Sequence, residues 1–328
     1  MKLLREHIRI TIKKCTPEKM AQGSNSVRQS RNILLCGIFS LFVFSLNAQS
    51  RFFQPADSIH KGRLIGTSAG VGTAWAGSML ALNHVWYSGF PQVKFHSFDD
   101  SKEWLQMDKA GHIYTAYHIS DKVAKLYKWS GMSNTGSALI GAGVGWGFQF
   151  SLELLDAKSA AWGFSWSDMT ANTIGTGIYL AQQLTWQEQK IKLKFSYSPT
   201  EYPQYRPEVL GATFPERLLK DYNGQTYWLS FSPGNLFPGS GIPPWLCIAA
   251  GYSIDGKLKG LENEYWTTDG RYFEAKREFV LSLDIDVTKL NIKKQWLRTL
   301  LSPFNMIKVP FPALLWRGGT LYGKPFYF

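Results

Sequence analysis

Apolar and small residues dominate the chain between about residues 62 and 186, and they recur at helical spacing. Residues 64–86 contain no Asp, Glu, Lys or Arg, and small residues occupy every fourth position from Gly62 through residues 66, 70 and 74 to Ser78. A second apolar segment, about 136–152, has glycines at 141, 143, 145 and 147. Because small residues every fourth position let helices approach closely, these segments predict tightly packed helices.

Two further helices complete this predicted bundle. One covers about 168–186, and the other, at about 107–129, is amphipathic and carries Asp121 and Lys122. The charges make that helix unsuited to crossing a membrane alone. The pattern leaves two settings open for the bundle, a membrane or a tightly packed soluble domain.

After Gln187 the pattern changes to alternating apolar and polar positions. Runs at 191–197, 227–231 and 279–287 alternate with a period of two, which is typical of half-buried strands. Asn-Gly, Asp-Gly and Gly-Gly pairs separate about seven such runs. The chain therefore predicts an α+β fold, in which a glycine-rich helical bundle precedes an antiparallel β region.

The last run ends on the aromatic Phe328, which resembles the closing strand of bacterial outer-membrane barrels. Such barrels need at least about eight strands of about ten residues, and several runs here are shorter. Pro310 and Pro312 interrupt one run and favour a strand at the edge of a sheet. An open sheet is therefore the prediction, with a closed barrel as the alternative.

The amino-terminal segment has the features of a secretory signal. Arg28 and Arg31 precede a fourteen-residue apolar run at 33–46, and Ala48 supplies the small residue before a cleavage site. We predict residues 1–49 to be a signal peptide, 50–187 a helical domain with a polar core, and 188–328 a β-rich domain. An uncleaved signal anchor is the alternative. Cys36 lies early in the apolar run, which does not fit a lipoprotein cleavage site.

Charge and composition restrict the classes of partner that we expect for the protein. The net charge is +12, but residues 1–50 contribute half of it, and the rest is spread without a dense basic run. Nucleic acid is therefore not an expected partner. Charged residues make up only 18% and aromatic residues 15% of the chain, which favours contact with membrane lipid. We predict an exported cell-envelope protein of the periplasm or outer membrane; the sequence identifies no protein partner.

Three polar clusters interrupt the apolar segments. Asp108, Lys109 and His112 form the first, Glu153 and Asp156 the second, and Ser165, Asp168 and Asn172 the third. Within each cluster the spacing of three or four residues places the side chains on one helix face. Because separate buried charges are costly, the clusters predict one shared polar site. Its named members are His112, Asp108, Glu153, Asp168, Lys109, Asp156, Ser165 and Asn172.

The residue types leave three uses of this site open. A structural polar network is the first. A catalytic site is the second, with His112 as general base beside Asp108, Glu153 and Asp168, and with Lys109, Asp156, Ser165 and Asn172 binding a ligand or stabilising the core. A divalent metal is the third, but only one good nitrogen ligand is present, and we predict neither a metal nor a cofactor.

These motifs resemble a known family. The Asp108-Lys109-x-x-His112 motif, the Glu153-x-x-Asp156 pair and the segment from Trp162 to Gly175 are similar to the YfiM-like family of predicted periplasmic lipoproteins. The first motif alone also resembles small membrane proteins called VanZ-like. The resemblance implies an envelope location and a shared polar core, and no reaction. The alternative function is a membrane-proximal hydrolase acting on lipid or cell-wall material.

Overall fold

A computed structural model describes residues 52–328, in which helices come first and strands follow. The predicted signal peptide and its two cysteines, Cys15 and Cys36, lie outside the described residues. Residues 55–328 form one unit. The helical part ends at Thr185 and the first strand begins at Ile191. The division into two domains at this point stays a prediction.

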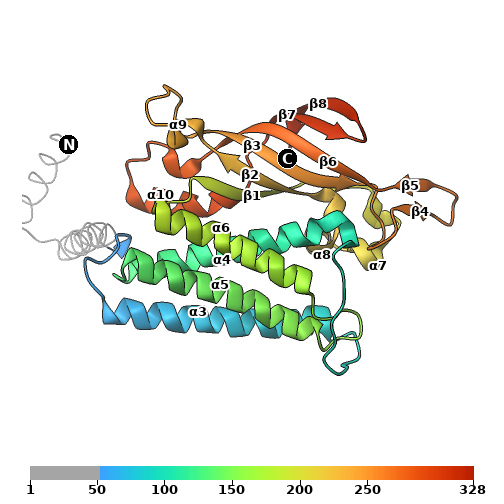
Figure 1. Cartoon of the computed structure of the whole chain (residues 1–328), viewed down its shortest axis with the longest axis horizontal. Coiled ribbons are helices and arrows are strands. Elements are labelled where there is room, and N and C mark those ends of the chain that lie inside the picture. Colours follow the sequence, from blue (N-terminus) through green and yellow to red (C-terminus); the bar gives the residue numbers. More distant parts are fainter. Residues whose placement is uncertain (1–51) are drawn as a thin grey trace, which may run out of the picture. The chain divides into compact units, whose positions relative to one another are not determined.

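Four long helices lie side by side beneath a sheet (Figure 1). They confirm the four predicted helices, and α4 keeps the predicted bounds. Serine side chains start two of them, because Ser133 accepts the amide of Gly136 and Ser165 accepts the amide of Asp168. The long helices are α3 (Lys61–Leu82), α4 (Met107–Trp129), α5 (Asn134–Asp156) and α6 (Trp166–Thr185). Short ones follow at α7 (Pro207–Leu210), α8 (Phe214–Lys220), α9 (Pro233–Leu236) and α10 (Gln295–Leu301).

Glycines bring α5 and α6 against α4. A Cβ atom added at Gly145 of α5 would lie 2.2 Å from the Ser120 hydroxyl, and one added at Gly175 of α6 would lie 2.2 Å from the carbonyl oxygen of Ile113. No side chain fits at such distances. The close helix approach predicted from these glycines is therefore present between α4 and its two neighbours.

The small residues of α3 do not make the same kind of contact, and this part of the prediction is wrong. A Cβ atom at Gly66 or Gly70 would meet nothing within 4 Å. Instead, the large side chain of Trp75 reaches α5, where it lies against Phe148 and next to Gly147. Gly66 and Gly70 lie on the exposed part of α3, where no neighbouring backbone among the described residues meets them.

The sheet is antiparallel, with the order β1-β2-β3-β6-β7-β8, and β4 and β5 form a separate pair. Together with the preceding helices it confirms the α+β fold class. The predicted edge position of the proline-containing strand is wrong, since β7 lies between β6 and β8. Pro312 is accommodated there by a register shift between Phe311 and Ala313. The strands are β1 (Ile191–Tyr197), β2 (Gln225–Phe231), β3 (Leu246–Asp255), β4 (Glu264–Trp266), β5 (Tyr272–Glu274), β6 (Lys276–Ile285), β7 (Phe311–Arg317) and β8 (Thr320–Tyr327).

One side of the sheet is buried and combines an apolar cluster, which includes Trp228, Val280 and Leu315, with polar side chains. Asp284 of β6 and Lys194 of β1 are fully buried there as an ion pair of 2.6 Å, and the Ser230 hydroxyl donates to the same aspartate. The sheet curls over this side, since the Ser198 hydroxyl donates to the carbonyl oxygen of Phe328, just beyond β8. Curling therefore brings the end of the chain close to the segment that follows β1.

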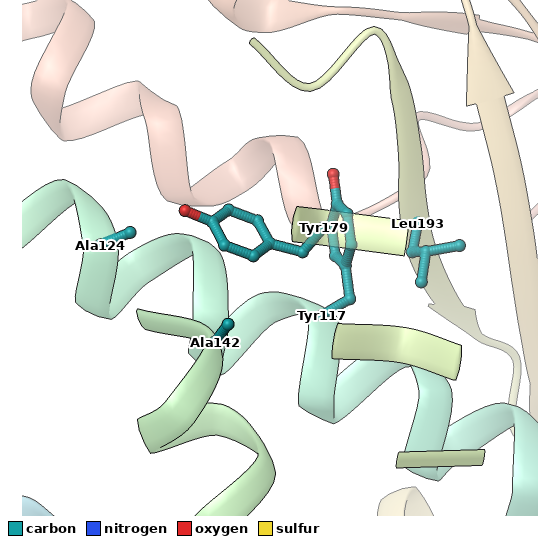
Figure 2. Close-up of a cluster of buried hydrophobic side chains, with 5 residues drawn as sticks. All are labelled: Tyr117, Ala124, Ala142, Tyr179 and Leu193. Carbon is teal, nitrogen blue, oxygen red and sulfur yellow. The ribbon is translucent and has the colours of Figure 1, made fainter. Parts of the chain in front are cut away.

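The other side of the sheet is apolar, and at β1 and β2 it packs on the helices. Leu193 of β1 joins Tyr117 and Ala124 of α4, Ala142 of α5 and Tyr179 of α6 in one core cluster (Figure 2). This core joins the sheet to α4, the helix that carries the first polar cluster.

A left-handed turn precedes α4. Trp104, Leu105 and Gln106 have φ angles of 48°, 50° and 65°, which are unfavourable for residues with a side chain. The sheet holds the turn, because Tyr252 of β3 and Arg277 of β6 both donate to the carbonyl oxygen of Leu105. The start of α4 is thus set by contacts from two strands more than 140 residues later in the chain.

Among the described residues, α5 is the one helix whose length and apolar composition would allow it to cross a membrane. It lies against both α4 and α6. A core helix can have the same composition, and α5 is part of the helical layer.

Candidate functional site

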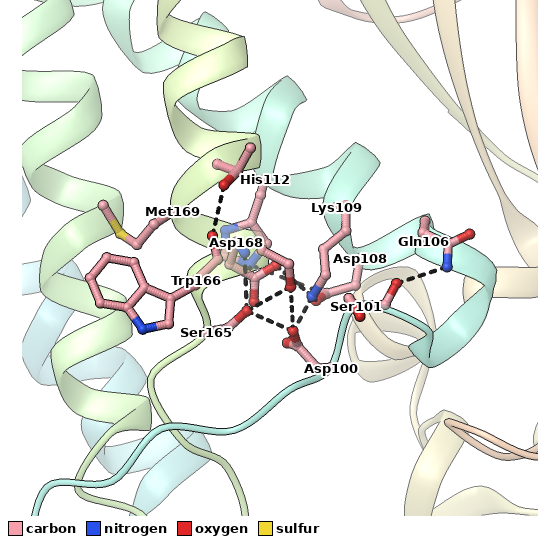
Figure 3. Close-up of polar contacts among 12 residues, drawn as sticks. Asp100, Ser101, Gln106, Asp108, Lys109, His112, Ser165, Trp166, Asp168 and Met169 are labelled. Carbon is pink, nitrogen blue, oxygen red and sulfur yellow. Dashed lines mark hydrogen bonds and ion pairs between the residues drawn. The ribbon is translucent and has the colours of Figure 1, made fainter.

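The first and third polar clusters meet at the amino-terminal ends of α4 and α6 (Figure 3). The carboxyl-terminal end of α5 brings Glu153 of the second cluster beside His112. Asp108, Lys109 and His112 lie in the first two turns of α4. Asp168 and Asn172 lie in the first two turns of α6, and Glu153 lies in the last turn of α5. The structure brings these six predicted residues together.

Lys109 is the centre of the ionic contacts. Its Nζ atom lies 2.6 Å from Asp168 Oδ1, 2.7 Å from Asp100 Oδ2 and 3.0 Å from Asp108 Oδ2. Its side chain is only 11% exposed. One buried cation therefore holds three carboxylates, two of them predicted from the sequence and one, Asp100, not predicted.

His112 is held through one ring nitrogen. Its Nδ1 atom lies 3.0 Å from Asn172 Oδ1, and this oxygen also accepts an N–H of Gln149. Gln149 Nε2 also lies 3.2 Å from Nδ1, so Nδ1 donates to Asn172 in one tautomer of His112 and accepts from Gln149 in the other. The other nitrogen, Nε2, faces Asp108 Oδ1 and Asp168 Oδ2, each at 3.8 Å. These separations are too long for hydrogen bonds.

Glu153 is completely buried. Its Oε2 atom accepts the backbone amide of Ser165, while Oε1 has no hydrogen-bond partner among the described residues and lies 3.9 Å from His112 Nδ1. Burial raises the pKa of Glu153 to about 8, and His112 opposes the shift. Glu153 is therefore largely protonated at neutral pH, when it can place a proton beside the imidazole.

Asp156 and Ser165 lie at the border of the cluster. Asp156 accepts the Tyr87 hydroxyl at 2.8 Å and has no direct contact with His112 among the described residues, and burial raises its pKa to about 6. The Ser165 hydroxyl caps α6 and donates to Asp100 at 2.6 Å. A serine that is committed in this way does not hydrogen-bond to His112, so the geometry gives no support to a Ser–His nucleophile.

The charges of the cluster shift one another's pKa values. Burial disfavours charge on His112, but Asp108, Asp168 and Glu153 outweigh burial and raise its pKa. Burial likewise disfavours ionised Asp100, but the hydrogen bonds from Lys109 and two serines lower its pKa to about 2. For Asp168 burial dominates and raises the pKa. The cluster thus combines firmly ionised carboxylates with groups that can exchange protons.

The arrangement offers both proton transfer and ion binding. The side chain of His112 is 16% exposed and that of Asp108 is 27% exposed, so solvent reaches part of the cluster. One ligand atom from each of Asp108, His112 and Asp168 lies within 4.8 Å of the other two. Imidazole and carboxylate groups at such separations can bind a divalent cation or activate water.

Three members of the cluster were not predicted. Asp100 lies in a loop without periodic spacing, and the Tyr222 hydroxyl donates to Asp108 Oδ1 from 114 residues further along the chain. Neither position carries a local sequence signal. Gln149 does, because it lies four residues before Glu153 on the same face of an otherwise apolar helix. Two polar residues four positions apart in an apolar helix are the signal that would have identified Gln149 as a member of the cluster.

The fold and the cluster define an α+β protein with a buried His/carboxylate site on its helices. Residues 97–183, which contain α4, α5 and most of α6, match a family described as predicted periplasmic lipoprotein (DUF2279). This description agrees with the location expected from the sequence: the protein is exported and belongs to the cell envelope. No curated protein and no solved structure matches the chain.

Proposed function

We propose that the protein is associated with the outer membrane or with the periplasmic face of a membrane, and that it contacts lipid through its sheet. The supporting observation is an apolar sheet patch on β6, β7 and β8. Its residues are between 46% and 64% exposed and share one side of the sheet: Phe279, Leu281, Leu283, Leu314, Trp316 and Leu321.

The alternation along β6 supports a lipid surface more than a solvated one. Phe279, Leu281 and Leu283 point outward, while Val280, Ser282 and Asp284, which alternate with them, are buried on the other side of the sheet, so two of the three buried positions are polar. A strand facing water normally has the opposite pattern, with apolar residues inside. Apolar side chains outside and polar ones inside are typical of strands that face lipid.

Vesicle binding tests this proposal. Purified mature protein should float with vesicles of phosphatidylethanolamine and phosphatidylglycerol in a density gradient. Burying a half-exposed leucine contributes about 1 kcal/mol, so the Leu281→Ser/Leu314→Ser variant should bind about 30-fold more weakly. The control is Leu219→Ser/Leu300→Ser, which changes equally exposed leucines on α8 and α10. Equal loss in both variants, or no flotation of the unaltered protein, contradicts the proposal.

A hydrolase acting on lipid or cell-wall material is the second candidate. It is supported by the partly exposed His112, whose Nε2 atom has no hydrogen-bond partner among the described residues and faces two carboxylates. In its neutral form, this nitrogen can take a proton from a water molecule that attacks an ester, amide or glycosidic bond. Water is the nucleophile that fits, because the nearby Ser165 and Ser167 hydroxyls donate to Asp100.

Labelled phospholipid vesicles and purified peptidoglycan provide the substrates for an assay. The His112→Gln variant should remain folded and release no product, while the control His84→Gln, which changes an exposed histidine, should act normally. Absence of product from the unaltered protein with both substrates rejects this candidate. The resemblance of the polar motifs to the YfiM-like family, and of the first motif to VanZ-like proteins, is compatible with either function.

A further inference from the structure

We propose that His112, Asp108 and Asp168 bind a divalent transition-metal ion. This inference does not depend on either proposed function, because such an ion could stabilise the helical layer or take part in a reaction. It revises the expectation from the sequence, which placed only one good nitrogen ligand here and predicted no metal.

The orientation of His112 is the first argument. Asn172 and Gln149 hold the Nδ1 side of the ring, so that Nε2 faces the space between Asp108 Oδ1 and Asp168 Oδ2. In the tautomer whose Nδ1–H donates to Asn172, Nε2 presents its lone pair to this space. Metal-binding histidines are commonly oriented in this way, by donating the other ring N–H to an oxygen acceptor. A histidine that served only as a packing element would not need its second nitrogen directed at two carboxylates.

The distances are the second argument. Nε2 lies 3.8 Å from each of the two carboxylate oxygens. This distance is too long for a hydrogen bond and too short for a water molecule to lie between the two atoms. Zinc-ligand bonds of about 2.1 Å place neighbouring ligand atoms about 3.4 Å apart in a tetrahedral site. Movements of about 0.4 Å would therefore bring each carboxylate oxygen to this separation from Nε2.

Lys109 leaves the required oxygens available. It contacts Oδ2 of Asp108 and Oδ1 of Asp168, whereas Oδ1 of Asp108 and Oδ2 of Asp168 face His112. Tyr222 donates to Asp108 Oδ1 and can orient it, as outer groups orient metal-binding carboxylates. The lysine thus fixes both carboxylates without occupying the oxygens that the ion needs.

Charge is the third argument. Four carboxyl groups, of Asp100, Asp108, Glu153 and Asp168, surround the single lysine and the imidazole. Glu153 is completely buried, and its Oε1 atom has no partner among the described residues while it faces the imidazole. A divalent ion on Nε2 would polarise the ring and strengthen the attraction between Nδ1–H and this oxygen. With His112 neutral, as a metal ligand must be, the three aspartates leave two negative charges beyond the one that Lys109 balances, and a divalent ion would neutralise them.

The ligand set indicates the class of ion. One imidazole and two carboxylates suit Zn²⁺ or Mn²⁺, whereas Ca²⁺ prefers six to eight oxygen ligands. The ion should therefore bind more tightly as Zn²⁺ or Mn²⁺ than as Ca²⁺, with water completing its coordination.

Calorimetric titration tests the site with ZnCl₂, MnCl₂ and CaCl₂ on full-length protein that has been stripped with a chelator. We expect one Zn²⁺ or Mn²⁺ per chain and weaker Ca²⁺ binding. His112→Phe and Asp168→Asn should each lower the Zn²⁺ and Mn²⁺ affinity at least 10-fold. Circular dichroism checks that these variants are folded. The electron paramagnetic resonance spectrum of bound Mn²⁺ reports nitrogen coordination independently of activity.

Two controls separate this site from others. Asp121→Asn changes a buried, ion-paired aspartate elsewhere on α4, and His84→Gln removes an exposed imidazole. Both should bind Zn²⁺ like the unaltered protein. The proposal is overturned if stripped protein binds neither metal at millimolar concentration, or if folded His112→Phe and Asp168→Asn variants bind as tightly as the controls do.

Discussion

Replacing Lys109 with methionine should destabilise the protein strongly. Methionine keeps most of the side-chain volume but removes the charge that lies within 3.0 Å of three carboxylates. Removing one partner of a buried ion pair costs about 3–5 kcal/mol, and the 11% exposure of Lys109 leaves little water to compensate. We therefore expect a loss of about 3–5 kcal/mol in the free energy of unfolding at pH 7.

Urea unfolding followed by circular dichroism measures this loss. In thermal unfolding it corresponds to a fall in Tm of about 6–20 °C, at about 2–4 °C per kcal/mol for a chain of this size. The matched control is Lys125→Met on the same helix. Lys125 pairs with Asp121 but is 59% exposed, and such pairs contribute about 1 kcal/mol or less.

A second variant shows whether the loss comes from the carboxylates. In the Lys109→Met background, Asp100→Asn removes one of the unpaired charges and should restore part of the lost stability, although the same change in the unaltered protein should be destabilising. The reasoning is refuted if Lys109→Met costs no more than Lys125→Met, or if the two changes at residues 109 and 100 are simply additive.

Two further predictions concern other parts of the helical layer. Gly175→Ala should lower the free energy of unfolding by about 1–3 kcal/mol in a urea titration, because its Cβ atom would overlap the carbonyl oxygen of Ile113. The control Gly177→Ala, whose Cβ atom meets nothing within 4 Å, should be neutral or stabilising. Equal effects of the two substitutions would contradict this account of the packing. Burial disfavours ionised Asp121, but two neighbouring lysines outweigh burial and lower its pKa to about 2. The charge of Asp121 therefore stabilises the fold above about pH 4, and this contribution disappears as the pH falls through 2. Asp121→Asn should accordingly cost about 2 kcal/mol at pH 7 and little at pH 2, and a difference that does not change with pH would exclude this origin.

The helices and most of the cluster could be predicted because their signals are local. Asp108 and His112, or Asp168 and Asn172, are four residues apart and must share a helix face, and the cost of separate buried charges then predicts that the faces meet. The structure places them so. The β-strands that alternate, such as β1 and β6, were predictable for the same reason of short-range periodicity.

The remaining features depend on contacts between distant segments. The small residues of α3 have the spacing of a packing surface, but which side of the helix meets a neighbour depends on how the whole bundle packs, and Gly66 and Gly70 lie on an exposed side. Tyr222 reaches Asp108 from the β region, and no pattern near either residue indicates the pairing. The left-handed turn at 104–106 contains no glycine, so the sequence offers no local signal for it.

That strained turn couples the start of α4 to the sheet. Three left-handed residues hold about 1–2 kcal/mol of strain each, and the hydrogen bonds from Tyr252 and Arg277 to Leu105 resist its release. If the strands moved and these bonds broke, the turn would relax toward the right-handed form and lengthen α4 by nearly one turn. Asp108, which lies two residues beyond the turn, would shift when the turn relaxes. A force on the sheet would thereby reach the polar cluster as a rotation of the helix that carries it.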